Sequence, residues 1–127
     1  MFELKVKTNR RMEVKEITEE VKRIVIGKEG RLIHLYTPHT TCGLIINEDA
    51  DPNITIDIME GLERLAPKDY RYRHTEGNAD AHVKATITGC SVTLPFKDGT
   101  PLLGRWQGIF LLEFDGPRER RVIVTIL

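Results

Sequence analysis

Cysteine and tryptophan are scarce in this sequence, which holds two cysteines and one tryptophan among 127 residues. Cys42 and Cys90 lie far apart and form no C-x-x-C pair, so the sequence indicates neither a thiol-only zinc site nor a disulfide framework. We therefore expect both cysteines to be reduced, buried thiols, with Cys42 in a structural role.

An excess of charge of one sign is also absent, because 19 basic residues balance 19 acidic ones. Without net charge there is no overall field to attract DNA, RNA or an anionic membrane, so general nucleic-acid binding is disfavoured. No apolar run approaches the roughly 18 residues of a membrane span, and the start, MFELKVKTNR, lacks the apolar core of a signal peptide. We expect a cytoplasmic protein with no nucleic-acid or membrane partner. The balanced charge is compatible with self-association.

The common nucleotide-binding and hydrolase motifs are missing as well. The sequence has no G-x-x-x-x-G-K-[ST], no G-x-G-x-x-G and no G-x-S-x-G, which excludes the usual phosphate cradles and the nucleophile elbow. Low-complexity tracts are absent, while hydrophobic residues make up 40% and charged residues 30% of the chain. This composition and length predict one domain, residues 1–127, folded throughout.

The sequence does contain a series of short periodic segments. Strands are predicted at residues 2–6, 12–14, 32–37, 42–46, 108–114 and 122–126, with a hairpin turn at Asp98-Gly99. Helices are predicted to begin near Thr18 with a hydroxyl cap, at Asp51-Pro52 and at Asn78, and to end before Gly27, at Pro67 and at Gly89. Because the strands frame three helices without a regular βαβ alternation, the pattern favours an antiparallel α+β domain.

Three of the four histidines stand beside polar groups in turns or at helix starts, namely His39 in TPHTT, His74 in YRHTEGN and His82 in NADAHVK. His34, between two apolar residues of a predicted strand, differs. Taken singly, each histidine is most simply explained by local hydrogen bonding. As a set, however, His39, His74 and His82 are predicted to converge on one site, where nearby carboxylates would complete a divalent metal centre.

An acidic cluster, Asn47-Glu48-Asp49-Ala50-Asp51, stands where a strand gives way to a helix. Carboxylate oxygens of this kind suit Mg²⁺, which usually binds alongside substrate phosphates. The alternative is helix capping with a solvated acidic surface, and it explains Asp51. It does not require Asn47 or Glu48, so these remain candidates for function.

Trp106 and Gln107 stand together in the segment LGRWQ. An indole face can stack on a planar heterocycle and an amide can read its hydrogen-bonding edge, although a core tryptophan in a turn is the commoner arrangement. Glu113, within IFLLEFDG, must be paired, protonated or coordinated unless it faces solvent at an edge. In the RERR run that follows, an arginine could pair with a phosphate, or the run is a solvated turn.

Three segments together resemble the YjbQ-type family, the secondary thiamine-phosphate synthases: HTTCGLIINEDADP, HTEGNADAHVKATITG and SVTLPFKDGTPLLGRWQGIFLLEFDGPRERRV. The most specific part is Ser91 to Gln107, with a serine, alternating apolar positions, Gly99 and a glycine two residues before Trp-Gln. Arg105 occupies a position where the family pattern has threonine, so no family role is carried over to it.

The resemblance implies a compact α+β subunit similar to a β-sandwich with helices, assembled as a homotrimer. It also implies an activity, the joining of a hydroxymethylpyrimidine diphosphate to a thiazole phosphate with release of pyrophosphate. The positions matching the family's motifs give a catalytic set of His39, His74, His82, Glu48, Asn47 and Asn78. The substrate-binding set is Thr40, Thr41, Gly104, Trp106, Gln107 and Glu113, and the metal-binding set is His39, His74, His82 and Asp49.

This chemistry suits the residue types. Expelling pyrophosphate requires stabilisation of the departing charge, by a divalent metal ion such as Mg²⁺ or Zn²⁺ or by histidine and arginine donors. Two other functions remain open. One is a non-catalytic trimer that binds a metal or a phosphorylated small molecule, and the other is a metal-dependent hydrolase in which histidine and glutamate activate water.

Overall fold

Eight strands and three helices make up the computed structural model, which describes residues 1–127. The strands are β1 (Phe2–Lys7), β2 (Glu13–Glu16), β3 (Leu32–Tyr36), β4 (Cys42–Glu48), β5 (Ser91–Lys97), β6 (Thr100–Pro101), β7 (Gln107–Glu113) and β8 (Glu119–Ile126). The helices are α1 (Thr18–Val25), α2 (Pro52–Leu65) and α3 (Ala79–Thr88). The predicted α+β class with about three helices is confirmed.

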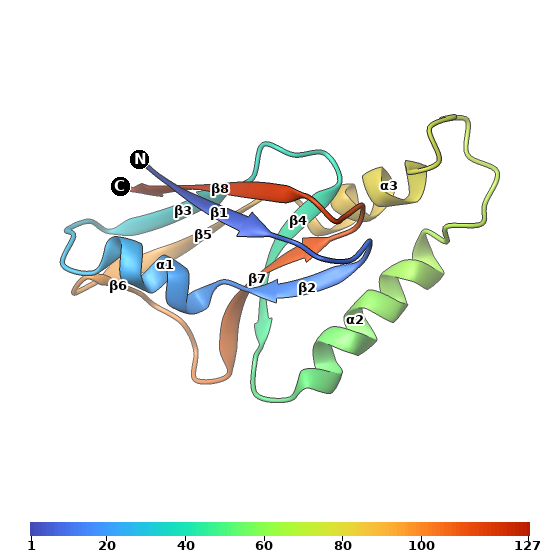
Figure 1. Cartoon of the computed structure of the whole chain (residues 1–127). Helices are drawn as coiled ribbons and strands as arrows, with labels where there is room; N and C mark the ends of the chain where they lie inside the picture. The colour runs from blue at the N-terminus through green and yellow to red at the C-terminus, as the bar shows by residue number, and fades with distance from the viewer.

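The strands form two sheets in which every pairing is antiparallel. The larger sheet has the order β1-β8-β3-β5-β6 and the smaller one β2-β7-β4 (Figure 1). The amino and carboxyl termini lie side by side at one end of the molecule, because β1 and β8 are neighbours in the larger sheet. This confirms the sandwich-like arrangement of antiparallel sheets.

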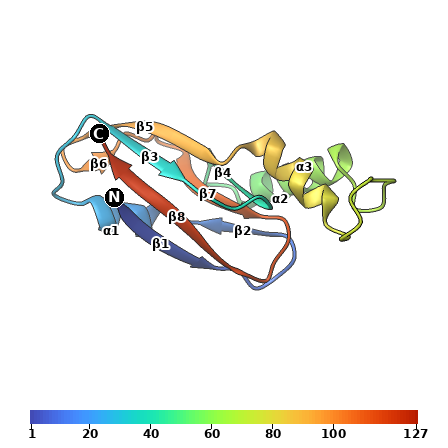
Figure 2. The same cartoon turned by 90° about the horizontal axis from the view of Figure 1, so that it is seen from above.

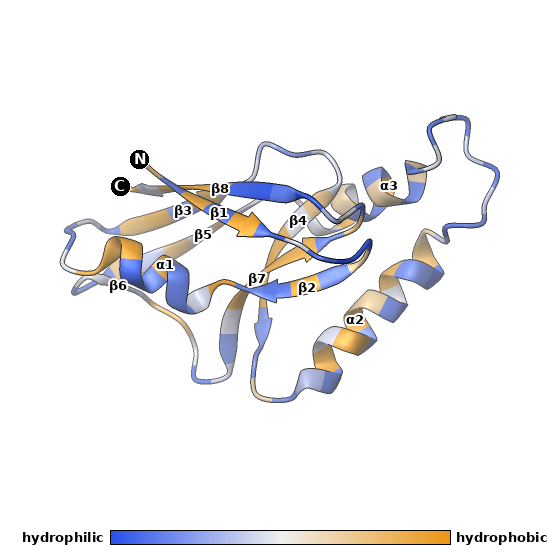
Figure 3. Ribbon diagram, in the orientation of Figure 1, coloured by the Kyte–Doolittle hydropathy of each residue, from blue (hydrophilic) through white to orange (hydrophobic).

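The smaller sheet packs against the larger sheet on one face and against helices α2 and α3 on the other. Seen from above, α2 and α3 lie at the end of the molecule away from the two termini (Figure 2). One apolar core lies between the two sheets and α1, and includes Leu111 of β7 and Val122 of β8. A second core lies between the smaller sheet and helices α2 and α3, and includes Leu112 of β7 and Ala81 of α3. Since successive side chains of β7 enter opposite cores, this strand is apolar along most of its length, as Figure 3 shows.

The helix ends agree only partly with the predicted caps. Asp51 accepts a hydrogen bond from the Asn53 backbone N–H at 2.9 Å, which confirms its capping role at α2. Thr18 does not cap α1, because the N-cap residue is Ile17 and has no side-chain capping bond. The buried Thr18 hydroxyl instead accepts from the Ile109 N–H at 2.8 Å and so joins α1 to β7.

Two further boundaries also follow from local geometry. The turn between β5 and β6 consists of Asp98 and Gly99, both with positive φ (54° and 76°), as a two-residue hairpin requires. Strand β4 runs two residues beyond its predicted end at Ile46, because Glu48 still pairs with Gln107 of β7.

None of the three helices has the length and hydrophobicity that a membrane-spanning helix requires.

Candidate functional site

A cavity of about 370 Å³ lies where the loop before β4 meets α3. Its walls are formed by His39, Thr40, Cys42, His82, Ala85, Thr86, Gly89 and Cys90. Two of the three predicted histidines therefore share one cavity, together with one predicted threonine and both cysteines. We refer to it as the histidine cavity.

The ring of His39 is held at the rim of the histidine cavity by the backbone of β8. Its Nε2 accepts a hydrogen bond from the Arg121 N–H at 3.1 Å. Partial burial and the nearby charges of Arg120 and Arg121 lower the pKa of His39 below 6.5. Near neutral pH the ring is thus neutral, with its proton on Nδ1. Nδ1–H is free to donate to a ligand, whereas Nε2 is engaged and unsuited to binding a metal ion.

His82 lines the histidine cavity together with His39 and is also next to His74. The rings of His74 and His82 are 5.2 Å apart between centroids and inclined at 57°. The exposed His74 also has its Nε2 3.9 Å from a carboxylate oxygen of Glu76. His34 lines no part of the cavity, and its Nδ1 lies 2.9 Å from the Thr93 hydroxyl on the larger sheet. The structure thus places His82 in one cavity with His39 and next to His74, and it keeps His34 apart.

Asn78, at the start of α3, serves to fasten the helix to the turn after β7. Its amide Nδ2 donates to Asp115 Oδ2 at 2.8 Å, and Arg118 donates to the same oxygen at 2.9 Å. Burial of Asp115 opposes ionisation, but these two donors outweigh it and lower the pKa of the carboxyl group. The buried Oδ1 of Asn78 has no hydrogen-bond partner. The amide therefore positions α3, and with it His82.

Glu113 and Thr41 have a different role from the substrate contact that the resemblance implies. Glu113 is completely buried and binds the Arg120 guanidinium through both oxygens, at 2.8 and 2.5 Å. It also accepts from the Thr8 hydroxyl at 2.8 Å, while Arg120 donates to the Thr41 hydroxyl at 2.8 Å. Of the three buried states considered for Glu113 (paired, protonated or coordinated), the structure shows the paired one, with Arg120 as the partner. This group links the two sheets and exposes no carboxylate oxygen to a ligand in the single chain.

The acidic cluster lies at the other end of β4 and lines a second cavity of about 220 Å³, which includes Glu16, Glu48, Asp49 and Asp51. The carboxyl groups of Glu16 and Asp49 approach each other over Gly108, where an added Cβ would lie 2.8 Å from Glu16 Oε2 and 3.0 Å from Asp49 Oδ2. Partial burial, and then the charge of Asp49, raise the pKa of Glu16 above 4.5. Asn47 is occupied locally, since its Oδ1 accepts from the Glu48 N–H at 2.7 Å. We call this region the acidic edge.

Trp106 projects from the loop between β6 and β7, next to the acidic edge. The indole is 57% exposed, so the interpretation as a core tryptophan is wrong. The Arg105 guanidinium lies over the indole ring, 4.8 Å from its centroid. Gln107 closes the loop by accepting from the Gly104 N–H at 2.7 Å, which leaves only its NH₂ group free. The Trp106 carbonyl accepts from the Asp49 N–H at 2.9 Å and so fixes the loop against the acidic edge.

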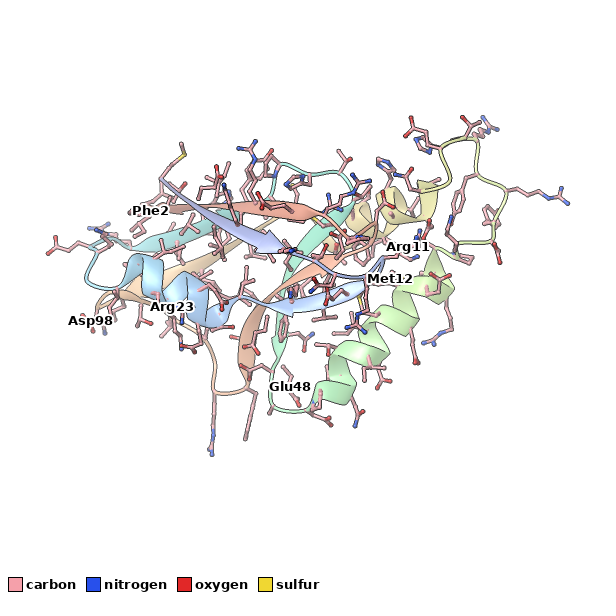
Figure 4. The ribbon with its side chains drawn as sticks, in the orientation of Figure 1. Phe2, Arg11, Met12, Arg23, Glu48 and Asp98 are labelled. Atoms are coloured by element: carbon pink, nitrogen blue, oxygen red, sulfur yellow. The ribbon has the colours of Figure 1, made fainter.

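The predicted site residues therefore fall into two groups at opposite ends of β4. Cys42, at the start of β4, lines the histidine cavity, whereas Glu48, at its end, lines the acidic edge. Six residue steps of about 3.3 Å separate the two ends by roughly 20 Å. Figure 4 shows Glu48 at the lower end of the molecule, and Figure 1 shows α3 at the opposite end. The two cavities share no residue.

A metal centre within one chain would need ligands that the structure does not bring together. No group of three or more histidine, cysteine, aspartate or glutamate side chains is arranged to hold a metal ion. The carboxylates of the acidic edge suit a hard cation such as Mg²⁺ better than Zn²⁺, and Mg²⁺ commonly completes its shell with water and substrate phosphates. Binding of a divalent metal ion by this protein therefore stays a prediction.

Two features near the histidine cavity were not predicted. Cys90 is exposed, contrary to the expectation of two buried thiols, because it follows the end of α3 at Gly89, and only Cys42 is buried. Lys84 is completely buried on α3 and donates to Asp80 and Glu63, each at 2.6 Å. The spacing of Asp80 and Lys84 by four residues on one helix face is the signal that indicates this pair.

Asp80 also receives two hydrogen bonds from Arg11, at 2.7 and 2.9 Å. Burial of Asp80 opposes its ionisation, but Arg11 and Lys84 together lower the pKa of the carboxyl group. This network connects α3 both to α2 and to the segment between β1 and β2. It fixes the helix that carries His82 two residues from Asp80.

These features define the class of protein: an α+β domain of two antiparallel sheets, with a histidine cavity at one end of β4 and an acidic edge at the other. Comparison with known proteins gives the family. Residues 2–127 match the family described as UPF0047 protein YjbQ-like. The chain belongs to this family, as its resemblance to the YjbQ-type proteins predicts.

Relatives of similar length support this assignment. A UPF0047 protein of Methanocaldococcus jannaschii is 47% identical over 130 residues, covering 100% of this chain and 94% of that protein. One of Archaeoglobus fulgidus is 49% identical over 128 residues, covering 99% and 100% of the two chains. A crystal structure of a YjbQ/UPF0047-family protein from Clostridium acetobutylicum matches with a TM-score of 0.94 and 42% identity over 100% of both chains. The similarity therefore extends over the whole fold.

Proposed function

We propose that this protein is a transferase of the thiamine-phosphate synthase type, acting as a homotrimer. It would join a hydroxymethylpyrimidine diphosphate to a thiazole phosphate and release pyrophosphate. The single observation that carries the proposal is the histidine cavity, in which the neutral His39 offers Nδ1–H beside Thr40 and His82. These are donors suited to a phosphate group in a recess of small-molecule size.

In the proposed step, the bond between the exocyclic carbon of the pyrimidine and the diphosphate oxygen breaks. The thiazole nitrogen forms the new bond to that carbon, and the electron pair of the broken bond leaves with pyrophosphate. Charge on the leaving oxygen grows in the transition state, so the donors His39, Thr40 and His82 accelerate the reaction by stabilising it. His74, beside His82, supports the position of the His82 ring.

The exposed Trp106 would provide the stacking surface for the pyrimidine. Its indole is more than half exposed, with the Arg105 guanidinium over the ring, and the loop that carries it is held by Gln107 and by the Asp49 backbone. Glu48 and Asp49 of the acidic edge would hold a Mg²⁺ ion, whose chemistry is to neutralise phosphate charge.

The test is turnover with the purified chain, both substrates and Mg²⁺, with pyrophosphate and thiamine phosphate measured together. We expect both products in equal amounts, and a rate at saturating substrate that falls at least tenfold in His82→Gln. Pyrophosphate release without the thiazole partner would instead indicate the hydrolase. Saturable binding of the diphosphate without any turnover would indicate the non-catalytic binder.

A further inference from the structure

We infer that the complete site forms between two copies of this chain that meet head to tail, the histidine cavity of one copy facing the Trp106 loop and acidic edge of the next. The inference rests on the proposed function, because it assumes that one substrate uses both groups of residues. Its physical basis is the separation of these groups along β4.

The separation is fixed by the rigid sheet that lies between the two ends. Strand β4 is paired along its full length with β7, from Cys42 opposite Glu113 to Glu48 opposite Gln107. The ends lie roughly 20 Å apart at about 3.3 Å per residue, which is beyond the length of one small substrate. Within one chain, no bending of a loop brings Trp106 to His82 while this ladder is intact. A second copy is the remaining source of the missing half.

The two ends also differ in electrostatic character. The histidine cavity lies beside two arginines of β8, because His39 at its rim accepts from the Arg121 N–H and Arg120 donates to Thr41. The acidic edge is lined by Glu16, Glu48, Asp49 and Asp51 and by no basic residue. Opposite fields attract when unlike ends meet, whereas a two-fold contact between like ends would place acidic edges together. Charge complementarity therefore favours the head-to-tail arrangement.

Exposed apolar side chains lie at both ends. Trp106 is exposed beside the acidic edge, and Val83 and Ile87 form an exposed apolar pair on α3, which carries the wall of the histidine cavity. Val83 and Ile87 are one helical turn apart and therefore adjacent on the helix surface. A head-to-tail contact that covers the histidine cavity would also bury the exposed indole of Trp106. Repeated around a closed ring, it yields as many identical sites as there are copies.

Mixing two impaired variants tests whether the site is shared, provided that the pyrimidine substrate is kept well below the wild-type KM, where a raised KM also lowers the rate. His82→Gln impairs one half of each site and Trp106→Ala the other half, and circular dichroism checks that both variants fold. In randomly mixed rings of three, three quarters of the rings contain both variants, and each such ring has one intact site among three. We therefore expect the mixture to recover about one quarter of wild-type activity. Activity no greater than the mean of the two parent variants would overturn the inference.

A second measurement does not depend on activity. The only exposed native thiol is Cys90 of the histidine cavity, since Cys42 is buried. In a Trp106→Cys variant, a short bis-maleimide linker should join Cys90 of one copy to the new thiol of the next, giving covalent dimers and trimers on a denaturing gel. The Cys90→Ser, Trp106→Cys double variant should give none. Ile26→Cys, whose position is exposed on a different surface, controls for random collisions.

The two experiments separate the inference from the proposed function. If the wild-type chain has no synthase activity but the linked species form, the proposed function fails and the shared arrangement stands. If the linker leaves only monomers although a monofunctional maleimide labels both thiols, the shared arrangement is wrong, whatever the activity. Equal cross-linking in the Ile26→Cys control would overturn it as well.

Discussion

The ion pair of Glu113 and Arg120, which links the two sheets, and the acidic edge are opposite environments for a carboxylate. Glu113 is completely buried, yet each of its oxygens has partners, and the donors Arg120 and Thr8 more than offset the cost of burial, so its pKa is lowered. Glu16, by contrast, lies at the protein surface, where partial desolvation and then the like charge of Asp49 raise its pKa. A buried charge with all its partners holds a structure together, while neighbouring like charges at the surface are suited to receive a cation or a positive partner.

The largest expected effect tests the buried side of this comparison. Replacing Glu113 by alanine leaves Arg120 buried without its counter-ion and should lower the free energy of unfolding by about 3 to 5 kcal/mol. Urea denaturation followed by fluorescence or circular dichroism measures this loss. A decrease below about 1 kcal/mol would show that Glu113 is not a structural link between the sheets.

The Lys84 network offers a second buried charge with a smaller expected effect. Lys84→Met removes the ion-pair partner of Glu63, which is already partly exposed to solvent. The buried carboxylate of Asp80 loses Lys84 but keeps its hydrogen bonds from Arg11. We expect a loss of about 2 to 3 kcal/mol in the free energy of unfolding. Lys22→Met, at a partly exposed ion pair on α1, is the matched control and should change stability by less than about 1 kcal/mol. Equal effects at the two lysines would contradict the assignment.

The acidic edge predicts a smaller, pH-dependent effect. Because the pKa of Glu16 is raised in the folded chain, its contribution to stability is fully present below its ordinary value of 4.5 and is lost as pH rises through the folded value. Glu16→Gln cannot ionise and so does not undergo this loss of stability as the pH rises. Above pH 4.5 the variant should therefore be more stable than wild type, by less than about 1 kcal/mol. Denaturation curves at several pH values measure the difference. A constant difference across this range would contradict the interaction with Asp49.

Trp106→Ala should have the smallest effect on folding. Since the indole is largely exposed, we expect the free energy of unfolding to change by less than about 0.5 kcal/mol. In the proposed reaction the same variant should mainly raise the KM for the pyrimidine substrate, because stacking acts in both ground and transition states. Thermal melting alongside kinetics distinguishes the two effects. Early melting would show that Trp106 is structural.

Much of the fold could be predicted because local patterns determine it. Alternation and short apolar runs predicted six of the eight strands, Asp51-Pro52 predicted the start of α2, and Asp98-Gly99 predicted the hairpin turn, but β5 and β6 on either side of that turn were not predicted. The cap at Thr18 was mispredicted because its hydroxyl bonds to β7, a contact 91 residues away in sequence. Local sequence therefore determined element positions better than side-chain partners.

The candidate site was only partly predictable for the same reason. The polar turn and helix-start settings of His74 and His82 suggested that they share one site, and their ring centroids lie 5.2 Å apart. The distance between His39 and Glu48 could also have been inferred, because the strand between them is extended. The exposure of Trp106 and the pairing of Glu113 with Arg120 depend on how distant segments pack, which no local pattern records.

The burial of β7 between two cores has a consequence for local opening of the fold. Opening β7 exposes apolar side chains of both cores at once, so its free energy of opening should approach that of global unfolding. Its amide protons should therefore be among the slowest to exchange with deuterated water. The segment 68–77, which has neither helix nor strand, should exchange its amides first. The loop leading to α3 can thus open around the histidine cavity while the strand ladder that spaces the two ends of the molecule remains closed.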